Sequence, residues 1–172
     1  MSRQLGVALL LTLLMMICVM LIGVSAAQMA LEGEKAARAA RDGHVAFQAA
    51  EDALSDAEKD IASAGGPHGG LVARAASGQT PAWQRIDLTG AVAGDEGSVE
   101  YGSFTGAEME TGQGFQPFRR PRYIIERMEC HQPGEDASAG APPKYCYRVT
   151  AIGFGAKPGT QLVLQSVYRR KE

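Results

Sequence analysis

The sequence predicts an α+β protein in which one long N-terminal helix packs on a C-terminal antiparallel sheet. An uncharged apolar stretch occupies residues 5–31, and a segment rich in Ala, Glu, Lys, Arg and Asp continues to residue 64. Of the 21 glycines, 17 follow residue 64, and ten of the eleven aromatic residues lie beyond residue 80. Aromatic residues favour strands and glycines favour turns, so we expect the sheet and the core in the C-terminal part.

Length and charge exclude several classes of protein. The chain has 172 residues and a net charge of -2, which suits one domain and excludes a large multidomain machine or a strongly basic nucleic-acid binder. The charge is segregated: -4 over residues 32–64, -4 over 65–118 and +5 over 119–172. This pattern fits either contact between neighbouring subunits or neutralisation of helix and sheet within one molecule.

The first structural element is an apolar segment over residues 7–27, interrupted only by Thr12, Gly23 and Ser25. As a helix it would be roughly 30 Å long, enough to cross a bilayer, so we expect insertion into a membrane. A secretory signal cleaved after Ala26 is one interpretation, although the apolar run is longer than the usual signal core of about 7–15 residues. An uncleaved anchor is another.

Residues 28–64 have the composition of a good helix former. Phe47, Leu54 and Ile61 recur every seven residues, which predicts one apolar stripe for packing on the sheet. Residues 65–67, Gly-Gly-Pro, should end the helix. The sequence leaves open whether the helix is continuous at Gly33 and Gly43.

The remaining segment, residues 65–172, should form the globular head. β-Branched and aromatic residues predict strands over residues 122–130, 145–155 and 160–169, with a hairpin connection at 155–159. Residues 83–88 and 98–104 are weaker strand candidates. We expect these strands to form an antiparallel sheet that packs on the apolar stripe.

The cysteines indicate an exported head. Cys18 lies within the apolar helix, so Cys130 and Cys146 should pair with each other. This bridge would close a loop of 17 residues and stabilise the fold by about 3 kcal/mol. The loop is either an exposed contact surface or a simple staple, and the residues alone favour neither.

No catalytic constellation with suitable spacing occurs, so we expect no enzymatic activity and no cofactor. Residues 65–70 lack the Lys-Ser/Thr of a phosphate-binding loop, and no Gly-x-Ser-x-Gly is present. Cys130, His131 and Cys146 supply three zinc ligands where a structural site needs four. The acidic turn at residues 95–100 lacks an EF-hand pattern, so we expect no metal there.

Several segments nevertheless resemble one family. Residues 1–6 form a short leader with one cation that ends in glycine, and this leader resembles that of type IV prepilins. In that family a peptidase cuts after the glycine and the new amino terminus is methylated, which implies cleavage between Gly6 and Val7. Residues 21–26 and 46–58 resemble PilX-type minor pilins of type IV pili, as do the closing strands at 147–155 and 163–168. Residues 71–119 carry no recognisable resemblance.

One position departs from the family pattern. Most pilins carry Glu at the fifth mature position, and counting from Val7 this residue is Leu11. In the family that Glu is thought to pair with the amino terminus of a preceding subunit, and its absence is familiar in tip-initiating minor pseudopilins. The resemblance therefore implies a subunit at or near the filament tip. The physical argument agrees, because a carboxylate in lipid is costly without its partner.

The resemblance implies a structural minor pilin that initiates or caps a type IV pilus. Its parts would be a leader (1–6), a filament-core helix (7–27), a stalk helix (28–64) and a head (65–172) with the disulfide-bounded loop 130–146. It would wait in the bacterial inner membrane with a periplasmic head, then join the pilus. The implied partners are the major pilin, other minor pilins, the prepilin peptidase, the secretion channel and a tip adhesin. The alternatives are a type II secretion minor pseudopilin and a signal-anchored periplasmic binding domain.

Overall fold

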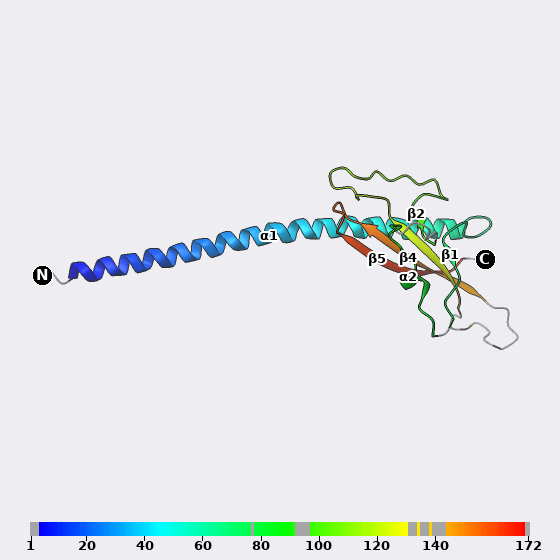
Figure 1. The fold of residues 1–172 in the computed structure, drawn as a ribbon, viewed down its shortest axis with the longest axis horizontal. Helices are drawn as coiled ribbons and strands as arrows, with labels where there is room; N and C mark the ends of the chain where they lie inside the picture. Colours follow the sequence, from blue (N-terminus) through cyan, green and yellow to red (C-terminus); the bar gives the residue numbers. More distant parts are fainter. Residues whose placement is uncertain are drawn as a thin grey trace. The chain divides into compact units, whose positions relative to one another are not determined.

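The structure is a computed structural model that describes residues 4–76, 78–91, 97–130, 134, 138 and 144–170. It divides into two compact units, Met1–Arg41 and Asp42–Glu172. The helix α1 (Gln4–Ala62) begins in the first unit and ends in the second (Figure 1). Gly33 and Gly43 are both helical, so neither glycine ends the helix. The helix has 59 residues and includes most of both predicted helical segments, 7–27 and 28–64.

The helix ends just before the predicted stop. After Ala62 the chain turns, and the backbone N–H of Gly66 donates to the carbonyl of Ser63 at 3.2 Å. Gly65 and Gly66 have φ angles of 106° and 83°. Only glycine adopts such values without steric cost, so this pair reverses the chain direction towards the sheet.

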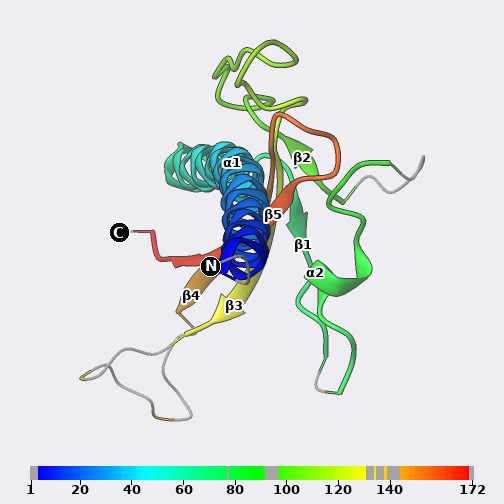
Figure 2. The ribbon, with the colours of Figure 1, turned by 90° about the vertical axis from the view of Figure 1, so that its left-hand side faces the viewer.

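The head contains one five-stranded sheet, shown in Figure 2 beside the helix. Three long strands form its centre and one edge: β3 (Arg122–Glu129), β4 (Tyr145–Phe154) and β5 (Gln161–Tyr168). They pair antiparallel in the order β3-β4-β5. Two short strands, β1 (Leu71–Val72) and β2 (Val99–Glu100), pair with β3, β1 parallel and β2 antiparallel. The sheet is therefore mixed but mostly antiparallel, and the predicted α+β class is confirmed.

The short elements correct the sequence prediction. Residues 83–88 are not a strand: α2 (Ala82–Arg85) is a single helical turn, and Ala82 and Leu88 are buried. The predicted strand 98–104 is reduced to β2, followed by turns. β1 was not predicted, because two paired residues give no periodicity that a sequence pattern can reveal.

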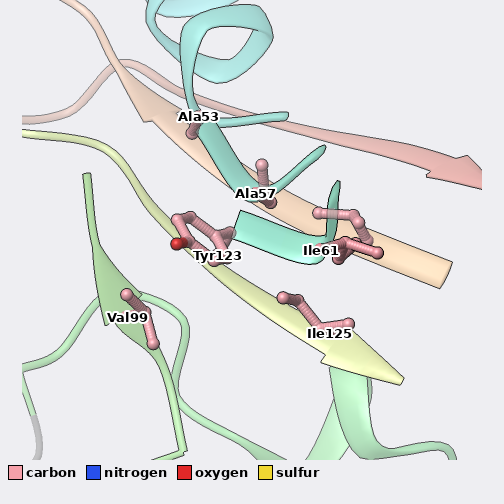
Figure 3. Close-up of a cluster of buried hydrophobic side chains, with 8 residues drawn as sticks. Ala53, Ala57, Ile61, Val99, Tyr123 and Ile125 are labelled. Carbon is pink, nitrogen blue, oxygen red and sulfur yellow. The ribbon is translucent and has the colours of Figure 1, made fainter. Parts of the chain in front are cut away.

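One face of the sheet packs on the second half of α1. The buried cluster there consists of Ala53, Ala57, Ile61, Val99, Tyr123, Ile125, Val149 and Ala151 (Figure 3). On the helix side most of these residues are alanines, so the helix backbone comes close to β4. A Cβ atom on Gly153 would lie 2.0 Å from the carbonyl oxygen of Ala46. Small residues on both sides therefore set the distance between helix and sheet.

The opposite face of the sheet is also covered in part. Ala82, Leu88, Ile124, Ile152 and Phe154 form a second buried cluster. Phe118 packs edge-on against Phe154, with ring centroids 5.2 Å apart. Because both faces are covered at β3 and β4, these strands bury consecutive residues, whereas β5 alternates between exposed and half-buried positions.

The three residues of the predicted packing stripe are buried to different extents. Ile61 is fully buried and Leu54 packs half-buried against the first cluster, but Phe47 is 38% exposed. Ala46 and Ala50 are fully buried instead. The helix approaches too closely at Gly153 for a phenyl ring to fit between helix and strand, so Phe47 lies beside the contact.

Candidate assembly site

The first unit presents an apolar helix surface. All described side chains between residues 7 and 41 are exposed. The most apolar window of 18 residues has a mean hydropathy of 3.0, and none of it is buried within the protein. This helix is long and apolar enough to cross a membrane. The core helix of a soluble domain would instead be mostly buried, so the exposure favours a lipid or protein environment for this segment.

The two hydroxyl groups in this segment are satisfied by the helix itself. The Thr12 hydroxyl donates to the carbonyl of Leu9, and the Ser25 hydroxyl donates to the carbonyl of Leu21, each at 2.9 Å. A polar group in hydrocarbon without a partner costs free energy, and such intrahelical bonds remove most of that cost. The hydroxyls therefore do not oppose burial of this surface in lipid or among other helices.

The predicted processing and filament-core positions lie at the start of α1. Gly6 is helical, Val7 is 65% exposed and Leu11 is 58% exposed. Residues 1–3, which hold the leader cation, lie outside the described residues. Cys18 is a free, exposed cysteine on the same helix.

In the second unit, Asp42 of α1 holds the turn between β4 and β5. One carboxylate oxygen accepts the backbone N–H groups of Ala156 at 2.7 Å and Lys157 at 3.2 Å. The other oxygen accepts the hydroxyl of Thr160. These hydrogen bonds, first that of Thr160, lower the pKa of Asp42 below its ordinary value of 3.8. A Cβ on Gly155 would lie 2.7 Å from the carboxylate, so glycine is required beside it.

Asp56 holds the turn that follows β2. Its carboxylate accepts the backbone N–H of Gly102 at 2.9 Å and the hydroxyl of Thr105. Gly102 has a φ of 80°, and a Cβ there would lie 1.9 Å from the carbonyl oxygen of Ala107. The tight turn therefore needs both glycine and the acceptor that the helix supplies.

Asp60 holds the segment just after the helix. One oxygen of its carboxylate accepts the backbone N–H of His68 at 3.0 Å. Nδ1 of the His68 side chain lies 2.7 Å from the other carboxylate oxygen. Asp42, Asp56 and Asp60 are 6%, 1% and 2% exposed. We call these three residues the aspartate clamps, because each joins α1 to a different loop of the head.

Two tyrosines lie near these carboxylates. The Tyr123 hydroxyl is buried and has no hydrogen-bond partner among the described residues. Burial first, and then the charges of Asp56 and Asp60, raise the pKa of Tyr123 well above its ordinary value. Burial and nearby Asp52 and Asp56 also raise the pKa of Tyr101. Both phenols therefore stay neutral at physiological pH and contribute packing rather than acid–base chemistry.

The predicted disulfide between Cys130 and Cys146 is confirmed, with Cα atoms 5.8 Å apart. The Cys130 backbone N–H donates to the carbonyl of Lys144 at 3.0 Å, so the bridge lies at the end of the β3-β4 ladder where the connecting loop begins. Of the loop that the bridge closes, residues 131–133, 135–137 and 139–143 lie outside the described residues.

Metal ligands do not gather in the described part of the chain. No group of three or more His, Cys, Asp and Glu residues is close enough there to hold an ion. Cys130 and Cys146 are joined to each other, and His131, Asp95 and Glu96 lie outside the described residues.

Comparison with protein families identifies the family to which the chain belongs. A family model described as the C-terminal part of the type IV pilus assembly protein PilX matches residues 68–170, which is more than half of the 172 residues. A second model, described as PilX N-terminal, matches residues 6–54. The chain belongs to the PilX family of type IV pilus assembly proteins. No curated protein and no solved structure matches it significantly.

The two PilX matches cover both units. The N-terminal match begins at Gly6 and extends into the helix half that carries Asp42. The C-terminal match includes all of the sheet and residues 71–119, in which sequence reasoning found no resemblance. The resemblance stated from the two helical segments and the closing strands is confirmed, and the PilX family is one of pilus assembly proteins.

Sequence reasoning missed the aspartate clamps. Aspartates on a helix usually lie on a solvated face, and the predicted stripe therefore used the large apolar residues. For Asp42 alone, the signal that could have found the clamp is the spacing of the alanines. One helix face is formed by residues at intervals of three or four: Asp42, Ala46, Ala50, Ala53, Ala57 and Ile61. Asp42 is therefore the first residue of the buried face.

Proposed function

We propose that this PilX-family chain is a minor pilin that initiates or caps the filament at its tip. In this proposal the leader is cut between Gly6 and Val7, and residues 7–27 wait in the inner membrane. The head lies in the periplasm until assembly. The partners are then the major pilin, other minor pilins, the prepilin peptidase, the secretion channel and a tip adhesin.

The proposed position at the tip is supported by Leu11. It is apolar and 58% exposed, at the fifth position after the proposed cleavage site. Most pilins have a glutamate there, which is thought to pair with the amino terminus of the subunit ahead. A subunit at the tip has no subunit ahead, so an uncompensated carboxylate would only cost free energy in an apolar environment.

The mechanism of assembly exchanges one apolar environment for another. The exposed side chains of residues 7–31 first contact lipid and then contact the apolar helices of other subunits. Lipid chains are about as apolar as leucine, so the exchange depends on packing rather than on removal of apolar surface from water. No side chain in this segment carries a charge that would have to lose its water shell on the way.

The first experiment is mass spectrometry of the mature amino terminus, on protein purified from its own membranes. We expect a methylated Val7. A chain that begins at Ala27 would show a released secretory protein, and an intact Met1 would show an unprocessed anchor. Either result contradicts the proposal.

The second experiment tests the tip position. Leu11→Glu supplies the carboxylate that most pilins have, so we expect the variant subunit to appear along the filament instead of at its end. Immunogold labelling of sheared pili measures this distribution. Leu10→Glu is the matched control, because it adds the same charge one position earlier and should reduce insertion without moving the subunit along the filament. An unchanged tip position and pilus number in Leu11→Glu would contradict the argument.

A further inference from the structure

Among the described residues, β5 pairs with a strand on one side only, which leaves the other edge of this eight-residue strand unpaired. β5 is the last strand in the order β1-β3-β4-β5, and all eight of its residues pair with β4 without a bulge. Among the described residues, no loop forms a backbone hydrogen bond with residues 161–168. An edge of this kind offers a row of N–H and C=O groups to another strand.

The two edges of the sheet differ in how they are protected. At the β3 edge, β1 and β2 contain only two residues each, which is too short to template another strand. β5 has none of the usual protections, because its sequence, Gln-Leu-Val-Leu-Gln-Ser-Val-Tyr, contains no charge and no proline. Val163 and Val167 on this strand are 50% and 60% exposed.

The pairing register identifies the backbone groups that face outwards. The Gly155 N–H donates to the Thr160 carbonyl at 2.8 Å, so these two residues lie at a hydrogen-bonded position of the β4-β5 register. Such pairs alternate along an antiparallel ladder. The N–H and C=O groups of Gln161, Val163, Gln165 and Val167 therefore point away from β4. Side chains of these same residues are the exposed ones on the strand.

Charge at the two ends of the edge indicates what can pair with it. Lys157 is exposed in the turn before β5, and Arg170 is exposed just after it. If two copies paired antiparallel through this edge, the Lys157 end of one would meet the Arg170 end of the other. The repulsion of like charges disfavours that dimer and favours a strand with acidic residues at its ends.

We propose that the β5 edge binds an extended segment of another protein by strand addition. The partner strand is β-branched in the middle, opposite Val163 and Val167, and acidic at both ends, opposite Lys157 and Arg170. Main-chain hydrogen bonds to residues 161, 163, 165 and 167 supply the affinity, and the cations select the partner. This inference concerns the head alone and does not depend on cleavage at Gly6 or on tip position.

The experiment uses the full chain in detergent micelles and a fluorescent peptide of alternating valine and threonine with two aspartates at each end. Fluorescence anisotropy measures its binding. Val163→Pro removes an outward N–H and leaves the β4-β5 ladder intact, so we expect at least about tenfold weaker binding. Val163→Thr is the matched control, because it keeps both the N–H and the shape, and should change binding by less than about threefold. Circular dichroism melting verifies that each variant is folded.

Gln165→Pro repeats the test at a second outward N–H, in case Val163→Pro does not fold. A peptide with lysines in place of the aspartates should bind at least about tenfold more weakly than the acidic one. The proposal is overturned if the acidic peptide does not bind or if folded proline variants bind it as tightly as the parent. It is also overturned if the lysine peptide binds equally well, or if the chain forms a dimer that Val163→Pro dissolves.

Discussion

The two halves of α1 differ in which residues they bury. Between residues 7 and 31 the helix exposes leucine, isoleucine, methionine and valine, whereas between residues 42 and 62 it buries three aspartates and a row of alanines. Both stretches are regular helix, so the difference lies in what surrounds them. In the second half the sheet and its loops supply N–H and hydroxyl donors to each carboxylate. Burial on this helix therefore follows the available partners rather than the hydropathy of the residue.

Loss of the close contact between the sheet and the second half of α1 should change stability the most. Gly153→Ala places a methyl group 2.0 Å from the Ala46 carbonyl oxygen and 2.5 Å from the Ala50 nitrogen. We expect the free energy of unfolding of the head to fall by about 3 kcal/mol or more. Urea unfolding of the full chain in micelles, followed by Trp83 fluorescence, measures it. Gly159→Ala is the control, because nothing lies within 4 Å of its Cβ, and a loss of equal size there would contradict the explanation.

The next prediction concerns an acidic residue introduced into the first half of α1, where no hydrogen-bond donors are available to it. Met16 is 64% exposed near the middle of the apolar segment. Met16→Asp should disfavour membrane insertion by about 2.5 kcal/mol, whereas Met16→Leu should leave it unchanged. Resistance to extraction by alkaline carbonate measures insertion. Equal resistance of the two variants would show that this segment does not lie in the bilayer.

A third effect concerns the clamp at Asp42. Asp42→Ala removes acceptors from two backbone N–H groups and one hydroxyl, and should destabilise the head by about 2 kcal/mol at pH 7. The pKa of Asp42 is lower in the folded state than its ordinary value of 3.8, so its contribution to stability is present above that value. The contribution is lost as the pH falls through the folded pKa.

Thermal melting between pH 3 and pH 7 therefore distinguishes the variants. The parent should lose stability below about pH 4, and Asp42→Asn should lose less over the same range because it has no proton to gain there. Glu51→Gln, an exposed acid on the same helix, should melt like the parent at pH 7. Identical acid profiles for the parent and Asp42→Asn would show that the clamp does not contribute.

A hydroxyl group in the first half of α1 should change insertion the least. The Thr12 hydroxyl donates to the Leu9 carbonyl of its own helix. Thr12→Val removes a group that is already satisfied, so insertion should change by less than about 0.5 kcal/mol in the carbonate assay. A change as large as that of Met16→Asp would mean that this hydroxyl bonds to another molecule.

The sequence could predict the elements whose signal extends over many residues. The long helix, the three long strands and the disulfide between Cys130 and Cys146 all have such signals, in composition, β-branched residues or cysteine position. β1 and α2 did not, because two or four residues give no period, and Trp83 suits a strand as well as a helical turn. The PilX resemblance was recognised at the two ends of the chain, where helix and closing strands are regular.

The clamps at Asp56 and Asp60 could not be predicted from local pattern, for a different reason. Whether Asp56 is buried or solvated depends on donors at Gly102 and Thr105, and no local rule places that turn beside the helix. Phe47 is the opposite case, a large apolar residue that is partly exposed. Its size suggested burial, but the approach of Gly153 to Ala46 leaves no room, and that distance is a property of the assembled pair of layers.

The hydrogen bonds of Asp42 also constrain the order in which the head is built. They join positions 114 to 118 residues apart in the chain. Helices form from local contacts, whereas a contact of such separation needs a large loop to close first. α1 can thus be complete while the ribosome is still making β3. The clamp at Asp42 closes only after Thr160 has been synthesised, so the helix waits for nearly the whole chain before the sheet docks on it.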